Sequence, residues 1–274
     1  MTILVTGATG NIGRHVVARL AAAGPAVRSM TRRPAGGGDV RGDFTRPETW
    51  AAALDGVRSV YLFPFAGPDF VAAAVRAGVR RFVVHSAAAA GFAAGTGGDG
   101  VLGRHLAEER DAHRGLELAV EASGAEWTHV RPGLLAAGAL RWADGIRRER
   151  VVREPYPAAG YPVVHEADVA DVAAAALLSA AHVGAAYTIT GPAKVTQAEQ
   201  AAAIGAAIGA PVRFEALDPA TADTPDWVLA LLADAVDGAG TLPPTDTYER
   251  LMGRPPRTFA QWAADHAADF RGAA

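Results

Sequence analysis

The first half of the chain alternates short apolar runs with longer segments whose apolar residues recur at helical spacing. The apolar runs predict strands over residues 3–6, 26–30, 40–43, 57–63, 81–86 and 127–131. The helical spacing predicts helices over residues 11–23, 50–54, 70–77 and 101–123, three of which are followed directly by glycine, at Gly24, Gly78 and Gly124. Regular alternation of this kind is typical of an α/β, doubly wound fold, in which helices cover both faces of a parallel sheet.

The second half is less regular. Four loop-forming residues between 155 and 162, a helix over residues 169–178 and a strand over 187–190 are expected, and Thr196–Glu199 and Thr258–Gln261 fit the capping box that begins a helix. We therefore predict a first domain over residues 1–150 with a return segment near 163–190, and a smaller, interleaved region over 151–274. The glycine-rich segment 87–100 is predicted to be a functional or disordered loop.

Three glycines stand between the first strand and the first helix. Gly7, Gly10 and Gly13 have the spacing G-x-x-G-x-x-G, which permits a tight turn, close backbone approach to a pyrophosphate, and close packing of helix on strand. The following helix would present free N–H groups and its positive dipole end to the same anion. The alternative is a set of turn glycines that binds no ligand.

The residues after the second and third strands bear on the choice of dinucleotide. An acidic residue after the second strand would bind the ribose 2′-hydroxyl of NAD, but this chain has Arg32 and Arg33 there. Paired arginine N–H groups suit a 2′-phosphate, so NADPH/NADP+ is the predicted cofactor; the alternative is two solvated loop arginines. Asp43 and Phe44 could flank the adenine, one by a hydrogen bond and one by packing.

The amino-acid composition argues against several classes of catalytic and binding site. The 274 residues include no cysteine, which excludes disulfides, thiolate nucleophiles and cysteine-bound metal, and the net charge of −3 gives no support for nucleic-acid binding. The eight histidines form no H-x-x-x-H or H-E-x-x-H motif and no G-x-S-x-G is present, so neither a metal site nor a serine nucleophile is expected. Without a targeting or membrane-spanning segment, we expect a cytoplasmic protein without a membrane partner, as a monomer or homodimer.

Several longer segments resemble the NmrA-like group of atypical short-chain dehydrogenase/reductases. The resemblance covers most of the chain and is carried by VTGATGNIG, TRRP, GDF, RFVVHS, HRGLELAVEASGAEWTHVRPG and VVHEADVADVAAAAL, beginning at residues 5, 31, 42, 81, 113 and 163. It implies a Rossmann domain that binds NADP and a smaller C-terminal domain, with the substrate held over the nicotinamide between them.

The resemblance also implies individual cofactor-binding positions. The pyrophosphate loop would be Gly7, Thr9, Gly10, Asn11, Ile12 and Gly13. Arg32 and Arg33 would hold the 2′-phosphate, and Asp43 and Phe44 the adenine. Phe63 and Pro64 would belong to the segment that runs beside the cofactor ribose. Ser86 and the segment of Pro132 would lie near the nicotinamide.

Ordinary members of this superfamily protonate the carbonyl oxygen with a tyrosine whose pKa is lowered by a lysine four residues later. Lys194 is the only lysine of this chain, and Thr190 stands four residues before it, so no Tyr-x-x-x-Lys occurs. In the long helix the lysine position corresponds to Glu117 or to a neighbour of His113. The usual acid is therefore missing.

Two functions fit these observations. One is an NADPH-dependent reductase of a quinone or an activated aromatic ketone, which needs an acid least; an aromatic polyketide ketoreductase of antibiotic biosynthesis, acting for example on an angucyclinone, is the specific expectation from the resemblance. The other is a redox sensor that binds NADP(H) without turnover, since binding needs only the glycine loop and the arginines.

Polar and apolar residues near the expected substrate position are further candidates. The predicted catalytic residues are Ser86, His113 and His165, with His165 at a strand end facing the cleft; the alternatives are a histidine bound to backbone and a solvated His113–Glu117 pair. The predicted substrate residues, each of which could instead be a packing residue, are Leu134, Leu135, Trp142, Tyr156 and Tyr161.

Overall fold

The computed structural model describes residues 2–34, 36, 38–236 and 242–271. Within it the chain divides into two compact units. Unit 1 comprises Met1–Gly91, Glu109–Pro132 and Glu166–Thr188, and unit 2 comprises Phe92–Glu108, Gly133–His165 and Ile189–Ala274. Residues 92–108 and 133–150, which we predicted within the first domain, thus pack with unit 2.

Unit 1 is built on a seven-stranded sheet of order β3-β2-β1-β4-β5-β6-β9. Its strands are β1 (Thr2–Thr6), β2 (Ala26–Thr31), β3 (Asp39–Arg41), β4 (Val57–Leu62), β5 (Arg81–His85), β6 (Glu126–Pro132) and β9 (Ala185–Ile189). The pairs from β3 to β6 all run parallel. The chain order reverses beside β1, and in open α/β sheets a ligand binds beyond the carboxyl ends of the strands at such a point.

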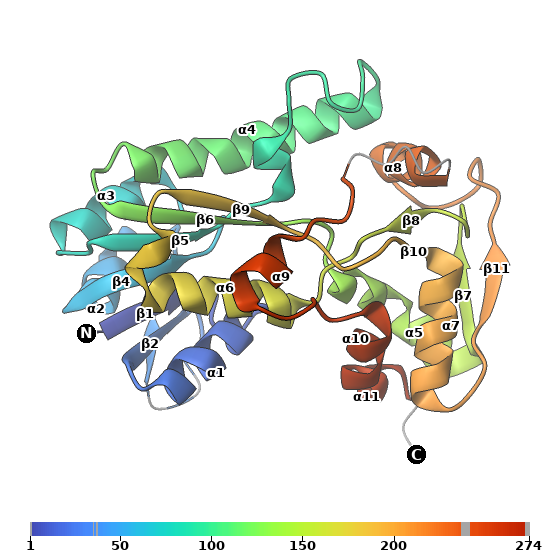
Figure 1. Cartoon of the computed structure of the whole chain (residues 1–274), viewed down its shortest axis with the longest axis horizontal. Helices are drawn as coiled ribbons and strands as arrows, with labels where there is room; N and C mark the ends of the chain where they lie inside the picture. Colours follow the sequence, from blue (N-terminus) through green and yellow to red (C-terminus); the bar gives the residue numbers. More distant parts are fainter. Residues whose placement is uncertain (1, 35, 37, 237–241, 272–274) are drawn as a thin grey trace. The chain divides into compact units, whose positions relative to one another are not determined.

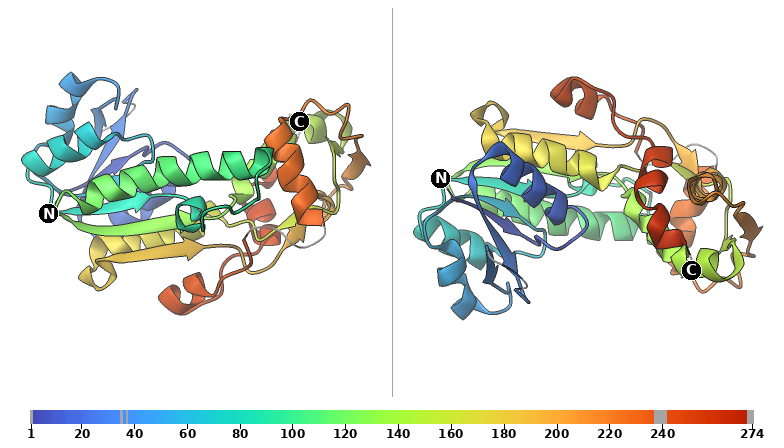
Figure 2. Two further views of the ribbon diagram at one scale, coloured as in Figure 1. Left: turned by 90° about the horizontal axis from the view of Figure 1, so that it is seen from above. Right: turned by 90° about the horizontal axis from the view of Figure 1, so that it is seen from below.

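Helices cover both faces of this sheet (Figures 1 and 2). α3 (Pro68–Arg76) and residues 109–121 of α4 (Val101–Glu121) lie on one face, and α1 (Gly13–Ala23) and α6 (Glu166–Leu178) lie on the other; α2 (Trp50–Leu54) follows β3. One buried cluster joins Val60, Leu62 and Val84 of the sheet to Phe70 of α3 and Leu116 of α4. The strands are apolar on both faces because both faces are covered.

Unit 2 contains short strands and helices around its own core. Its elements are α5 (Ala143–Glu149), β7 (Val151–Glu154), β8 (Gly160–Tyr161), β10 (Val195–Thr196), α7 (Gln197–Ile208), β11 (Arg213–Ala216), α8 (Asp226–Val236), α9 (Thr247–Met252), α10 (Phe259–Asp265) and α11 (Ala267–Phe270). β7 pairs with β11, and β8 with β10. Trp142, Ile146, Ile204, Trp262 and Phe270 belong to its core.

The α/β, doubly wound fold predicted from the sequence is confirmed. Both predicted capping boxes are present, at Thr196–Glu199 before α7 and at Thr258–Gln261 before α10. In the described residues, short 3-10 helices lie at Pro47–Thr49, Ala88–Gly91, Ala136–Trp142 and Ala180–His182. One of them interrupts the predicted loop 87–100, where Ala88, Ala89 and Ala90 are buried.

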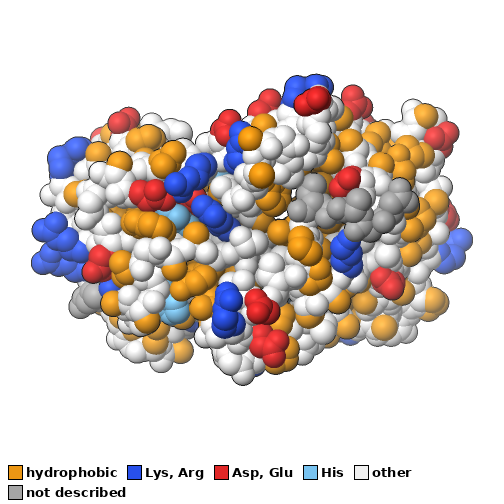
Figure 3. All heavy atoms as spheres, turned by 45° about the horizontal axis from the view of Figure 1, so that its top comes forward, with side chains coloured by type: hydrophobic (Ala, Val, Ile, Leu, Met, Phe, Trp, Pro, Cys, Tyr) orange, Lys and Arg blue, Asp and Glu red, His pale blue; other side chains and the backbone are white. Residues whose placement is uncertain are grey.

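The surface carries charges of both signs. On the face drawn in Figure 3, basic and acidic side chains are interspersed among hydrophobic and uncharged groups. In the described part of the chain, no helix combines the length and the apolar character needed to cross a membrane.

Candidate functional site

The turn between β1 and α1 can be built only with glycine at two positions. Gly7 has φ +63°, a left-handed backbone conformation that is strained for any residue with a Cβ atom. A Cβ atom on Gly13 would lie 2.1 Å from the Gly7 carbonyl oxygen, so the first turn of α1 packs directly on the loop backbone. The helix begins without a side-chain cap and without an acidic residue in its first turn, which leaves its positive end available to an anion.

A threonine connects this turn to the neighbouring strand. The Thr6 hydroxyl donates to the Tyr61 carbonyl oxygen at 2.8 Å and accepts from the Phe63 N–H at 2.8 Å. Phe63 is thereby held beside the loop, where a Cβ atom on Gly7 would come within 3.0 Å of its ring. The carboxyl ends of β1 and β4 therefore form one rigid surface.

A pocket of about 970 Å³ lies over this surface. Eight predicted cofactor residues line it: Gly7, Thr9, Gly10, Arg32, Arg33, Asp43, Phe44 and Phe63. Seven further lining residues were not predicted from the sequence, namely Thr6, Met30, Thr31, Arg41, Gly42, Thr45 and Phe65. Met30 is the second-last residue of β2, and the other six end or follow one of the strands β1 to β4; this position was the signal that could have identified them.

The other predicted cofactor residues lie outside the pocket lining. Asn11, Ile12 and Gly13 continue from the glycine loop into α1, and Pro64 follows Phe63. Ser86 follows β5, and Pro132 is the last residue of β6, the next strand in the sheet.

The pocket combines one oriented carboxylate with exposed guanidinium groups. Asp43 accepts hydrogen bonds from the Thr45 N–H at 2.9 Å and the Thr45 hydroxyl at 2.8 Å, and these bonds, with the charges of Arg32 and Arg46, hold its pKa below the usual value. Asp43 is thus an ionised acceptor of fixed direction. Arg32 and Arg33 are exposed on the pocket lining. An acceptor for an adenine amino group and donors for a phosphate are therefore present together.

Ser86 lies at a buried ion-pair network rather than at an open surface. Glu117 is fully buried and receives two bonds from Arg131, Nε to Oε1 at 2.8 Å and Nη2 to Oε2 at 2.6 Å. Burial alone would raise the pKa of Glu117, but Arg131, Ser86, His129 and Arg114 together lower it to about 2. The Ser86 hydroxyl lies near Glu117, but it is buried and forms no hydrogen bond of normal geometry with a described residue.

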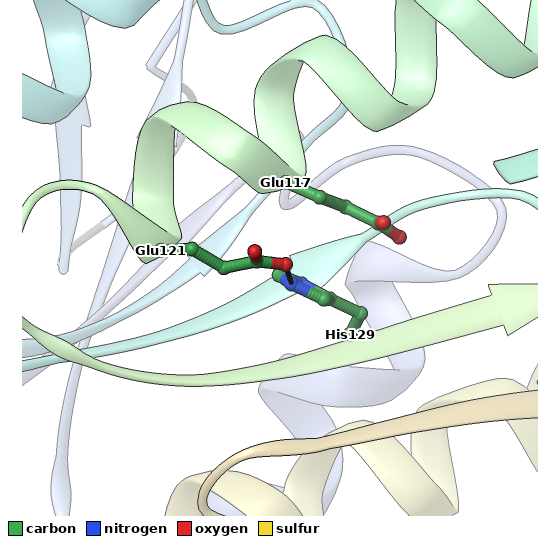
Figure 4. Close-up of side chains that lie close together, drawn as sticks. All are labelled: Glu117, Glu121 and His129. Atoms are coloured by element: carbon green, nitrogen blue, oxygen red, sulfur yellow. Dashed lines mark hydrogen bonds and ion pairs between the residues drawn. The ribbon is translucent and has the colours of Figure 1, made fainter.

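The same network holds a second carboxylate and a histidine. Glu121 accepts a hydrogen bond from Arg114 at 2.6 Å and another from His129 Nε2 at 3.0 Å, the second of which is drawn in Figure 4. One ligand atom each of Glu117, Glu121 and His129 falls within 4.8 Å of the others. Two arginines already bind these carboxylates, so the arrangement is an internal ion-pair network and gives no support for a metal centre.

His113 lies one turn before Glu117 on α4. It is partly buried, and burial lowers its pKa. Its Nδ1 atom is buried and has no hydrogen-bond partner among the described residues. Glu117 bonds to Arg131 and Arg114, and no bond joins it to His113 in the described part of the chain, so the solvated pair weighed from the sequence does not form.

A histidine–tyrosine pair at the carboxyl edge of the sheet was missed by the sequence analysis. The Tyr61 hydroxyl lies 2.7 Å from His85 Nδ1. Tyr61 is fully buried in β4, whereas His85, the last residue of β5, remains partly exposed. No sequence spacing indicated this pair, because 24 residues separate its members and only the parallel register of β4 and β5 brings them together.

The predicted substrate residues belong to unit 2. Trp142 and Tyr161 are buried in its core, with Trp142 Nε1 donating to Glu154 at 2.8 Å and the Tyr161 hydroxyl donating to the Leu231 carbonyl oxygen. Tyr156 packs against the same core. These three side chains therefore follow the packing alternative, whereas Leu134 is 45% exposed and Leu135 bridges to Val164.

His165 does not end a strand, contrary to the expectation from sequence. It follows the isolated bridge at Val164 and directly precedes α6, since β8 stops at Tyr161. Its Nε2 atom lies 3.3 Å from Asp265 Oδ2, a partner on α10 that the sequence did not indicate. His165 belongs to unit 2, while Ser86 and His113 belong to unit 1.

A glycine turn at the positive end of α1, beside a pocket with exposed arginines at the reversal point of a parallel sheet, defines a dinucleotide-binding protein of the Rossmann type. The residues fit a pyrophosphate because a Cβ atom at Gly13 would block the close approach of helix and loop that forms the cradle. A family model described as NAD(P)H-binding matches residues 7–180, and the chain belongs to this family.

Known proteins resemble the chain along almost its full length. It is 38% identical to the (4-alkanoyl-5-oxo-2,5-dihydrofuran-3-yl)methyl phosphate reductase of Streptomyces griseus, over 98% of this chain and 99% of the relative. It is 34% identical to the NAD(P)H azoreductase of Xenophilus azovorans, over 99% and 100%. The NADPH complex of the NADPH-dependent quinone oxidoreductase from Escherichia coli is 25% identical, with a TM-score of 0.74 over 96% of this chain and 99% of that one. The resemblance to the NmrA-like group is confirmed in the fold, which a solved NmrA structure shares with a TM-score of 0.68.

Proposed function

We propose that this NAD(P)H-dependent oxidoreductase transfers a hydride from NADPH to a conjugated carbonyl compound such as a quinone or an activated aromatic ketone. Gly7, Gly10 and Gly13 with the start of α1 would hold the pyrophosphate, Arg32 and Arg33 the 2′-phosphate, and Asp43 and Phe44 the adenine. Bound NADPH supplies the hydride. The chain's own residues would fix its position, with Phe63 forming part of the pocket wall.

The observation that carries this proposal is the missing Tyr-x-x-x-Lys motif, together with the residues at the place that the resemblance gives to its lysine, Glu117 or a neighbour of His113 on α4. His113 and Glu117 occupy that turn, and Glu117 is held by Arg131 and Arg114 and is fully buried. Neither residue reproduces a tyrosine hydroxyl whose pKa a neighbouring lysine lowers. A hydride acceptor that draws its electrons into conjugation needs such an acid least.

The names of the relatives agree with this class of acceptor. One names a reductase of a dihydrofuranone, one an azoreductase and one a quinone oxidoreductase. The first and third names give an unsaturated oxo-dihydrofuran and a quinone, both of which contain a conjugated carbonyl group, and the second gives an azo compound. An aromatic polyketide ketone, the specific substrate expected from the resemblance, belongs to the same class, as does an unsaturated lactone.

The test is NADPH consumption, followed by absorbance, with a panel of acceptors. The panel contains a naphthoquinone, a hydroxylated aryl ketone of the polyketide type and an alkanoyl-substituted unsaturated lactone; an isolated aliphatic ketone is the control acceptor. We expect turnover with at least one conjugated acceptor and none with the aliphatic ketone. Tight NADPH binding without turnover of any member would reject the reductase and favour the alternative of a redox sensor.

A further inference from the structure

The His85–Tyr61 pair lies beside the pocket, and neither residue belongs to its lining. The His85 ring is 5.9 Å from the ring of Phe63, which lines the pocket and packs on Gly7. His85 ends β5, the strand next to β4, on the carboxyl edge of the sheet where ligands bind. His85 therefore lies directly behind Phe63, a residue of the pocket lining.

Tyr61 decides which nitrogen of His85 carries the proton. Among the described residues, the Tyr61 hydroxyl has His85 Nδ1 as its one hydrogen-bond partner, at 2.7 Å. A buried O–H group needs an acceptor, and burial raises the pKa of Tyr61, so its hydroxyl keeps its proton and donates it to Nδ1. A neutral imidazole that accepts at Nδ1 carries its proton at Nε2.

Nε2 is then a donor without an acceptor in the described part of the chain, on a side chain that is partly exposed. The groups that face His85 favour its neutral form. Burial and the nearby His113 lower the pKa of His85 to about 4, and Tyr61 is uncharged. At neutral pH the side chain is an uncharged N–H donor of fixed direction. A neutral histidine of this kind can polarise a carbonyl group, as in triosephosphate isomerase.

We propose that His85 Nε2–H is the catalytic hydrogen-bond donor to the carbonyl oxygen of the acceptor, and that Tyr61 is the positioning residue that fixes its tautomer. This inference rests on the proposed reductase function. As the hydride bonds to the electrophilic carbon, the π electron pair moves onto oxygen, and the nicotinamide is oxidised while the acceptor is reduced. His85 stabilises the developing oxyanion and keeps its proton; water protonates the oxygen afterwards.

Two substitutions at His85 separate a donor from a packing residue. The Gln amide nitrogen reaches the place of Nε2, whereas the Asn amide nitrogen reaches only the place of Nδ1. We expect His85→Asn to lower kcat by about 10²-fold to 10³-fold, the usual loss when one donor to an oxyanion is removed. His85→Gln should recover at least tenfold of that loss, and Tyr61→Phe should lower kcat by about tenfold.

A second pair of the same type provides the controls. His182 Nδ1 lies 3.1 Å from the Tyr187 hydroxyl in unit 1, with neither residue on the pocket lining. His182→Asn and Tyr187→Phe should leave kcat within about twofold of the original protein. The Kd for NADPH, measured by fluorescence, should be unchanged in all five variants, which shows that each one folds and binds.

A readout independent of turnover is the ¹⁵N NMR spectrum of histidine-labelled protein. We expect His85 in the original protein to show a protonated Nε2 and an unprotonated Nδ1, and to show mixed tautomers in Tyr61→Phe. Equal kcat values for His85→Asn, His85→Gln and His182→Asn, or a proton on Nδ1 in the original protein, would overturn the proposal. An original protein that reduces no acceptor but shows the expected tautomer would instead reject the proposed function.

Discussion

At the scale of single residues, cofactor choice depends on the two arginines after β2. Arg32 and Arg33 are exposed on the pocket lining, and no acidic side chain stands in their place to bind a ribose hydroxyl. A guanidinium–phosphate bond contributes more than a neutral hydrogen bond because one partner or both are charged. The arginines should therefore distinguish NADPH from NADH.

Replacement of both arginines by alanine tests this assignment. We expect the KM for NADPH to rise about 10-fold to 100-fold in Arg32→Ala/Arg33→Ala, while the KM for NADH changes little, since NADH has no 2′-phosphate. Arg153→Ala is the matched control, because Arg153 is an exposed arginine that pairs with Glu149 and Glu215 in unit 2 and lies outside the pocket lining. Equal changes for the two cofactors would contradict the assignment.

At the scale of elements, the ion-pair network joins α4 to β6. Glu117 lies on the helix and Arg131 on the strand, and their two bonds are buried. Ser86, which follows β5, lies near Glu117 as well.

Removal of the buried carboxylate should destabilise the protein much more than removal of an exposed one. Glu117→Ala leaves Arg131 without its partner, and we expect the free energy of unfolding to fall by about 3–5 kcal/mol. Glu215→Ala breaks the exposed pair with Arg153, for which we expect about 0–1 kcal/mol. Denaturant unfolding of both variants measures the difference. Similar losses of unfolding free energy would show that the buried network contributes no more to stability than an exposed ion pair.

At the scale of the whole molecule, burial makes stability depend on pH. Burial lowers the pKa of His85 to about 4 and lowers those of His113 and His129 below 6.5. Below pH 6.5 the unfolded chain therefore binds more protons than the folded one, and the free energy of unfolding must fall as the pH is lowered. Glu117 adds to the loss at lower pH, because its folded pKa is about 2.

We expect stability to be complete above about pH 6.5 and to decline between pH 6.5 and about 4. Each of these histidines can contribute at most about 1.4 kcal/mol per pH unit. The measurement is denaturant unfolding at several pH values, and His85→Gln should reduce the slope because it removes one of the three groups. Tyr61 and His113, which face His85, are retained in that variant. A slope that is unaffected by His85→Gln would show that His85 is not a buried neutral group.

The sequence by itself determined the fold class and most of the dinucleotide pocket. Both are encoded by local patterns: apolar runs alternating with helical spacing, three glycines at a fixed interval, and the residues that directly follow each strand. Because the carboxyl ends of parallel strands meet at one edge, Gly7, Arg32, Asp43 and Phe63 could be grouped without a structure. The missing Tyr-x-x-x-Lys was likewise readable from the positions of five tyrosines and one lysine.

Only the tertiary structure decided which side chains pair and which are buried. Trp142 and Tyr161 look the same in sequence whether they bind a substrate or fill a core, and their burial and hydrogen bonds resolve this in favour of the core of unit 2. The network around Glu117 and the His85–Tyr61 pair depend on contacts between different elements. Strand register and burial, which set distance and pKa, arise from packing of the whole chain, and local sequence spacing does not encode them.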